Sequence, residues 1–182
     1  MRQDARENRE RILAAAEEVF GAQGGAGSTE EVARLAGVGI ATVFRHFPTK
    51  EELIEAALLR HFDHLTERAH ALAAGADLAV AWRTLVRTLI ETGATKLTMA
   101  SMLAGREGYP TGAAVAASNR LKDTVRAILR QAQDAGVVRS SVTVEEVYLL
   151  IRALAQASAT MTARPGTLDR AIDVVLAGLS AP

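Results

Sequence analysis

Five polar residues between positions 28 and 55 combine side chains and a spacing that suit contact with nucleic acid. Their hydroxyl, guanidinium, imidazole and ammonium groups all donate hydrogen bonds to phosphate oxygens, and an arginine can also bind the edge of a guanine base. Each has a simpler alternative role, as a solvated cation, a hydroxyl bonded to its own helix or a ring packed against a neighbouring helix. The five residues are Thr29, Thr42, Arg45, His46 and Lys50.

The residues around them predict a helix-turn-helix that holds these side chains on one surface. Ser28 and Glu31 have the spacing of a capping box, which begins a short helix. Gly37 stands where the turn requires a residue free to adopt a positive φ. A second short helix is expected over residues 40–47, ended by Pro48 because proline disfavours a helical conformation for the residue before it. In this motif the second helix enters the major groove of duplex DNA.

Lys50 stands at the first turn of the next helix, which is expected over residues 50–73. The free N–H groups and the dipole of a helix N-terminus attract phosphate, and the ammonium group adds a full positive charge. The formal net charge of the chain is zero, so any affinity for DNA has to come from such a local patch. We therefore expect Lys50 to bind the DNA backbone.

The rest of the chain predicts further helices and no sheet. Hydrophobic residues make up 49% of the sequence and there are only 4 prolines, while alanine and leucine propagate helices at little entropic cost. Apolar residues recur at helical spacing, and capping or breaking residues separate the segments. We therefore expect an all-α protein of nine helices. The six further helices are expected over residues 4–22, 78–89, 97–104, 113–135, 144–163 and 168–179, with a loop at 105–112.

Composition and motifs exclude several classes of protein. Without cysteine there is no disulfide, zinc-thiolate site or thiol nucleophile, which is compatible with a reducing cytoplasm. No nucleophile or base has an orienting partner visible in the sequence, and no glycine-rich phosphate loop occurs. There is no secretory signal and no run of about 18 apolar residues that would span a membrane. We therefore expect a cytoplasmic, nucleoid-associated protein that is not an enzyme and uses no cofactor.

The stretch AGVGIATVFRHFPTKEELIEAAL, residues 36–58, resembles the TetR family of bacterial transcriptional regulators. It looks like the family's recognition helix, its terminating Phe-Pro and the Lys-Glu-Glu-Leu that starts the fourth helix. The resemblance implies a nine-helix architecture with a helix-turn-helix DNA-binding domain over residues 1–48 and a ligand-binding and dimerisation domain over residues 49–182. It also implies a homodimeric repressor that binds a palindromic operator in double-stranded DNA and is released by a small apolar effector of unknown identity.

Three positions depart from the family's usual pattern. Gly39 stands where a hydroxyl residue commonly caps the recognition helix, Ile40 where a polar residue often faces DNA, and Phe44 where tyrosine is frequent. The bare backbone N–H of Gly39 permits a close approach to DNA. Ile40 and Phe44 carry large apolar groups, so we expect them to contact thymine methyl groups instead.

Two further sets of residues are predicted to line an effector cavity and a dimer interface. Large apolar and aromatic side chains line ligand pockets, although core packing is their alternative role. Stripes on the last two helices suit a four-helix bundle closed by two subunits, although both stripes could instead pack inside one subunit. The predicted effector-binding residues are Phe62, Trp82, Leu85, Met99, Met102, Tyr109 and Tyr148. The predicted interface residues are Val147, Ile151, Leu154, Ser158, Met161, Ile172, Val175, Leu176 and Leu179.

Two alternatives to a ligand-released regulator stay open at this point. One is a structural nucleoid protein that binds DNA without an effector, and the other is a helical small-molecule-binding protein whose headpiece no longer binds DNA. Three histidines at helical spacing, His61, His64 and His70, do not make up a full set of metal ligands, so we expect no metal site.

Overall fold

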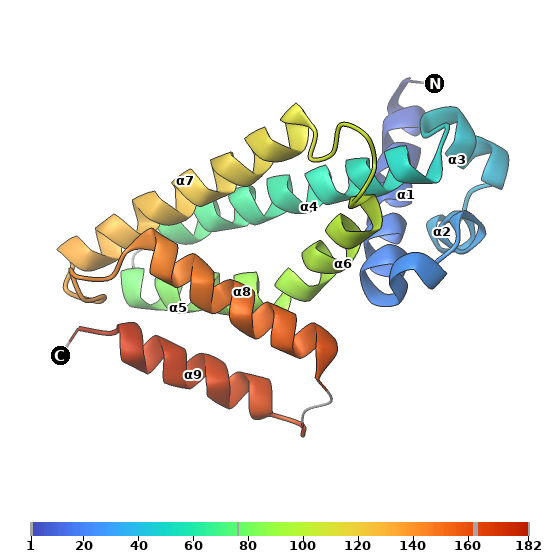
Figure 1. Ribbon diagram of the computed structural model, residues 1–182. Coiled ribbons are helices and arrows are strands. Elements are labelled where there is room, and N and C mark those ends of the chain that lie inside the picture. The colour runs from blue at the N-terminus through green and yellow to red at the C-terminus, as the bar shows by residue number, and fades with distance from the viewer. Residues whose placement is uncertain (1, 76, 162–163, 182) are drawn as a thin grey trace. The chain divides into compact units, whose positions relative to one another are not determined.

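The computed structural model describes residues 2–75, 77–161 and 164–181, and these form helices and loops with one isolated bridge between Val138 and Ser180. Nine α-helices occur in this part of the chain, and a turn of 3₁₀ helix follows the first (Figure 1). The predicted all-α fold is confirmed. The elements are α1 (Arg2–Gln23), η1 (Gly24–Ala26), α2 (Thr29–Ala36), α3 (Ile40–His46), α4 (Lys50–Ala73), α5 (Leu78–Glu91), α6 (Gly93–Leu103), α7 (Gly112–Asp134), α8 (Val144–Thr160) and α9 (Thr167–Leu179).

The helices group into two compact units, which are described separately below. The first unit comprises residues 1–63 and 95–117, and the second unit comprises residues 64–94 and 118–182. The predicted DNA-binding domain, residues 1–48, lies within the first unit, whereas residues 49–182 contribute to both units. The division of the chain at residue 48 therefore stays a prediction.

The first unit is built around the apolar face of α1. Ile12, Ala16 and Phe20 are fully buried on this face, spaced so that a helix brings them to one side. α1 contacts α2, and α2 contacts α3, so the three helices form the N-terminal bundle seen in Figure 1. Buried apolar residues anchor the two short helices: Val32, Ala33 and Ala36 of α2, and Val43 of α3.

A close helix contact also joins α6 to α1 within the first unit. A Cβ atom placed on Gly21 would lie 2.5 Å from Thr95 Cγ2, closer than two carbon atoms can approach. Glycine at this position therefore lets the two helices touch. On α4, the carboxylate of Glu55 accepts hydrogen bonds from Arg106 (2.9 Å) and from Thr111 (2.5 Å), which lie near the two ends of the predicted loop.

In the second unit α5, α8 and α9 pack against one another. Gly93 lies so close to α8 that an added Cβ would come within 2.6 Å of Ala155 Cβ. At the α5–α9 contact, the two Nη atoms of Arg87 donate to Asp169 (2.9 Å) and Asp173 (2.8 Å). These polar contacts are partly exposed, so apolar packing stabilises the three helices more than the ion pairs do.

Helix starts were predictable where a capping side chain exists. The reciprocal capping boxes at Ser28 and Thr143 are both present, and Asp77 caps α5 through two backbone amides. The largest difference concerns α6, which begins at Gly93 rather than near residue 97. Gly93 disfavours a helix, and Thr95, a residue type that can cap one, lies between these positions, so the local signals did not mark the observed start. α8 ends at Thr160, and the predicted end at residue 163 lies outside the described residues.

Candidate functional site

The second helix of the helix-turn-helix, α3, is short, and the residues before and after it determine where it begins and ends. Gly37 adopts φ 66°, the left-handed conformation predicted for the turn, and ends α2. Gly39 begins α3 without a side-chain cap, and its carbonyl accepts from Thr42 N at 2.8 Å. Phe47 ends the helix in an extended conformation and is buried, with the guanidinium of Arg9 5.4 Å from its ring centre. α3 is therefore fixed by the glycine turn at its N-terminal end and by the buried Phe47 at its C-terminal end.

The side of α3 that faces away from the bundle carries most of the predicted DNA contacts. Ile40 and Phe44, one helical turn apart, keep 37% and 44% of their surface exposed. Arg45 is exposed, and Thr42 and His46 are half-buried. Gly39 is exposed as well, and a Cβ at this position would meet nothing within 4 Å. Six of the eight predicted contact residues thus share the short segment 39–46.

Lys50 has a structural role that its sequence position did not suggest. Its Nζ atom donates to the carbonyl oxygen of Gly27 at 2.6 Å, lies 3.5 Å from that of Gly25, and sits 5.3 Å from the ring centre of Phe20. The ammonium group thus ties the start of α4 to the loop before α2. A phosphate contact by Lys50 would have to share or replace these hydrogen bonds.

Thr29 is the other predicted contact that the structure places differently. Only 8% of this residue is exposed, which argues against the predicted contact between its hydroxyl group and a phosphate. The residue follows the capping Ser28 and lies against the bundle in the first turn of α2. The sequence does not tell whether a residue directly after a cap is buried or exposed, because the rotation of the helix about its axis depends on packing.

The seven predicted effector residues divide between the two units. In the first unit Phe62 and Met99 are buried and Met102 and Tyr109 are half-buried; in the second unit Trp82 and Leu85 are buried and Tyr148 is half-buried. Within the described residues, Trp82 Nε1 and the Tyr148 hydroxyl oxygen are buried without a hydrogen-bond partner. Burial raises the pKa of Tyr148, and burial followed by the nearby Glu55 carboxylate raises the pKa of Tyr109. Both phenols therefore stay protonated and can donate a hydrogen bond.

The predicted dimer residues also fall into two groups. Five are buried within the chain itself, where they pack α8 and α9: Val147, Ile151, Ile172, Leu176 and Leu179. Leu154 and Val175 are half-buried, and Ser158 and Met161 are exposed, Met161 to 66%. The large apolar residues most exposed on these two helices were not predicted: Leu149 at 69% and Val174 at 72%. The alternative of packing inside one subunit thus describes five of the nine predicted residues, while other large apolar residues of α8 and α9 are exposed.

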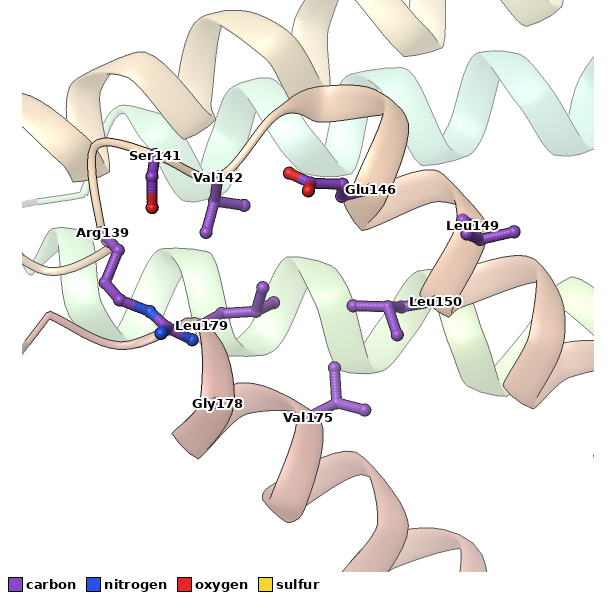
Figure 2. A pocket seen from close by; sticks show the side chains of 9 residues that line it. All are labelled: Arg139, Ser141, Val142, Glu146, Leu149, Leu150, Val175, Gly178 and Leu179. Atoms are coloured by element: carbon purple, nitrogen blue, oxygen red, sulfur yellow. The ribbon is translucent and has the colours of Figure 1, made fainter.

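Two grooves lie along this exposed side of α8 and α9. The first has a volume of about 480 Å³, and Figure 2 shows Leu150, Val175 and Leu179 converging in it, with Arg139 and Glu146 at its rim. The second has a volume of about 360 Å³ and is lined by Leu154, Ser158 and Met161 among others. None of the predicted effector residues lines either groove.

Sequence analysis missed one polar cluster, which joins α1 to α4. Glu17 receives hydrogen bonds from His61 and from Arg60, and Arg60 also reaches Glu10. The only signal was the spacing of the histidines, which we considered for a metal. Among the described residues no group of three or more histidine, aspartate or glutamate side chains could hold a metal ion, and no helix there is long and apolar enough to cross a membrane.

A helical bundle that presents a short, exposed helix after a left-handed glycine turn defines the class of helix-turn-helix DNA-binding regulators. Two family models match the chain: "Bacterial regulatory proteins, tetR family" over residues 12–57, and "Transcriptional regulator SbtR-like, C-terminal domain" over residues 77–181. The protein belongs to the TetR family of transcriptional regulators, and it is not an enzyme.

Solved structures agree with this assignment over nearly the whole chain. A TetR transcriptional regulator from Streptomyces coelicolor is 32% identical, with 95% of this chain and 98% of that chain covered and a TM-score of 0.82. A TetR regulatory protein from Mycobacterium vanbaalenii is 30% identical, with 99% of each chain covered and a TM-score of 0.80. The comparison with curated proteins gives no match.

Proposed function

We propose that the protein is a homodimeric repressor that binds a palindromic operator through α3 and leaves it when a small apolar effector binds. The observation that carries the DNA part is the exposed side of α3, where Gly39, Ile40, Phe44 and Arg45 lie within two helical turns. An exposed apolar pair beside a cation suits a helix that reads base edges and methyl groups in the major groove. Such a protein would act in the cytoplasm, on the nucleoid.

Selection of binding sites from fragmented genomic DNA with the purified protein tests this proposal. We expect a palindromic site whose half-sites are about 34–36 Å apart, because two symmetric recognition helices enter successive major grooves. Arg45→Ala should relax the selected sequence, whereas Arg130→Ala, which removes an exposed arginine from α7, should leave it unchanged. Binding without sequence preference would favour the structural nucleoid protein, and no binding would favour the small-molecule-binding protein.

The dimer part of the proposal is supported by exposed apolar residues on α8 and α9 and directly after α8. Leu149, Met161 and Val174 are each more than 60% exposed. Leu149 lines the first groove and Met161 the second. The same side of a second copy would fill the two grooves in an isologous interface, in which each subunit contributes the same residues. The four helices would then form the bundle expected from the sequence.

The effector part is supported by buried polar atoms that have no hydrogen-bond partner among the described residues. Trp82 Nε1 can only donate a hydrogen bond, and the Tyr148 hydroxyl group can donate one as well. Effector pockets combine apolar walls with a few such groups. Native mass spectrometry of the purified protein should detect a copurified small molecule, and that molecule should dissociate the operator complex. A bound molecule that leaves operator affinity unchanged would refute the proposed release.

A further inference from the structure

His61 is the most deeply buried titratable side chain that the proposed function does not use. It lies on α4 in the first unit and is 4% exposed. Its Nδ1 atom lies 2.6 Å from Glu17 Oε1 on α1. Its Nε2 atom is buried and has no hydrogen-bond partner among the described residues. Nδ1 is therefore held by a short hydrogen bond, whereas Nε2 lacks one.

The Glu17 carboxylate fixes both the orientation of the ring and the place of its proton. A carboxylate only accepts hydrogen bonds, so Nδ1 carries the proton and donates it to Oε1. Oε2 of the same carboxylate accepts from Arg60 Nη1 at 2.8 Å, and Arg60 Nε reaches Glu10 at 3.3 Å. Because both oxygens of Glu17 are engaged, the imidazole cannot turn without breaking a short hydrogen bond.

The charges around the ring indicate which ligand group Nε2 would accept. Two carboxylates, Glu17 and Glu10, pair with two guanidiniums, those of Arg60 and Arg9, so the charges of these four side chains are balanced. A charged ligand group buried beside them would have no partner of opposite charge, so a neutral group is favoured. When the ring carries one proton, on Nδ1, its Nε2 atom presents a lone pair, which accepts a hydrogen bond from an O–H or N–H group.

We propose that His61 Nε2 is the hydrogen-bond acceptor for a neutral, hydroxyl-bearing small molecule that binds in the first unit. Burying a polar atom without a partner is unfavourable, and a ligand hydroxyl group removes that penalty where a hydrocarbon of the same shape does not. The inference deepens the proposed function, since it names the chemistry of an effector, and it rests on that function only in treating the ligand as an effector. Glu17 is the positioning residue, because it touches the ring and not the ligand.

The first test observes the ring directly by NMR of protein labelled with ¹⁵N-histidine, without DNA. The His61 signals are identified by their loss in His61→Gln. We expect the free protein to hold the Nδ1–H tautomer of His61, with Nε2 free of a hydrogen bond. Phenol, benzyl alcohol and cyclohexanol are the hydroxyl probes, and toluene, ethylbenzene and methylcyclohexane are their counterparts without a hydroxyl group. At least one hydroxyl probe should move the Nε2 resonance saturably, and its counterpart should not.

Two results would overturn the proposal. One is an Nε2 resonance that no hydroxyl probe moves, or that each probe and its counterpart move equally. The other is a free protein in which Nε2 already shows a hydrogen bond, because a bound water molecule would then satisfy the atom. A failed operator selection, in contrast, removes the proposed DNA function and leaves these NMR results standing, so the two failures are distinguishable.

Matched variants give a second readout in thermal unfolding. The hydroxyl probe that moves Nε2 should raise Tm more than its counterpart does. This difference should vanish in His61→Leu and persist in His64→Leu, which changes an exposed histidine on the same helix. If His61→Leu does not fold, His61→Phe keeps a planar ring without the nitrogen and serves in its place. Persistence of the full difference in a folded His61 variant would overturn the proposal.

Discussion

Lys50, which is predicted to contact DNA, also serves the fold of the first unit. Its ammonium group holds the carbonyl oxygen of Gly27 at 2.6 Å, although its place at a helix start predicted a phosphate contact. A lysine can bridge a carbonyl and a phosphate because the ammonium group has three donors. Loss of a phosphate contact would lower DNA affinity and its salt dependence, whereas loss of the Gly27 contact would lower Tm.

Lys50→Ala should weaken binding to all DNA sequences similarly and reduce the slope of log K against log salt by about one unit. The reason is that one fewer phosphate is neutralised and one fewer counterion is released. The measurement is operator affinity by fluorescence anisotropy over a series of salt concentrations. Arg68→Ala, at an exposed position on the same helix, is the control and should leave the slope unchanged. An unchanged slope with a lowered Tm would assign Lys50 to the Gly27 tie alone.

Ile40 and Phe44 should contact thymine methyl groups at the operator. Replacing thymine with uracil at a contacted position should cost about 0.8 kcal/mol for the lost methyl group, roughly a fourfold loss of affinity. The loss should shrink in Phe44→Ala or Ile40→Ala at the position that each residue reads. Competition binding with singly substituted operators measures it. If no thymine in either half-site responds, the apolar side of α3 does not read methyl groups.

At the scale of helices, the places where the sequence was informative are those with a local physical signal. Capping residues such as Ser28, Asp77 and Thr143 satisfy free amides at the helix start, so they mark it without reference to the rest of the chain. The positive φ of Gly37 was predictable for the same reason, because a short turn needs it.

Contacts between helices carry no such signal. The 2.6 Å hydrogen bond from His61 to Glu17 joins positions 44 residues apart, and it depends on how α1 and α4 are rotated. The burial of Thr29 and the carbonyl contacts of Lys50 depend on packing in the same way. The exposed residues of segment 39–46 were predictable because the helix-turn-helix is a local motif. The exposure of Leu149 and Val174 was not predictable, because it depends on which sides of α8 and α9 pack inside the chain.

Gly21→Ala tests the closest helix contact in the first unit. Alanine in a helix is normally favoured over glycine by roughly 0.5–1 kcal/mol. Here the new Cβ would lie 2.5 Å from Thr95 Cγ2 and 3.3 Å from both Cβ and Oγ1, so rotating the threonine does not relieve the clash. We expect a net loss of about 1–3 kcal/mol in the free energy of unfolding, measured with urea.

Shortening the threonine side chain that causes the clash should restore stability. Thr95→Ala removes the nearest atoms, so the double variant should recover most of the stability that Gly21→Ala loses. Gly25→Ala is the control, because a Cβ there meets nothing within 4 Å. Additive effects of the two changes would show that α1 and α6 do not meet at this point.

For the whole molecule, we expect the exposed apolar residues of α8 and α9 to decide the state of assembly. Val174→Glu and Leu149→Glu should give folded monomers, because a carboxylate would be buried without a partner in the interface but is solvated in the single chain. Analytical ultracentrifugation measures the mass, and circular dichroism checks the fold. Val80→Glu, on an exposed part of α5, is the control and should stay dimeric.

Whether the variants are monomers or dimers should also determine how they bind the operator. Monomeric variants should lose affinity for the full palindrome while binding a single half-site as the wild type does, since each headpiece is intact. Stable dimers of both variants that bind the operator normally would place the interface elsewhere on the molecule.

The apolar pair on α3 has one more consequence, for the chemical state of the chromosome. Thymine differs from cytosine in the major groove partly by a methyl group at C5, and 5-methylcytosine carries a methyl group at the same position. A helix that reads that group with Ile40 and Phe44, exposed to 37% and 44%, responds to the methyl group itself rather than to the base beneath it. Enzymatic methylation of cytosine would then draw the protein to sites that the unmodified genome does not offer.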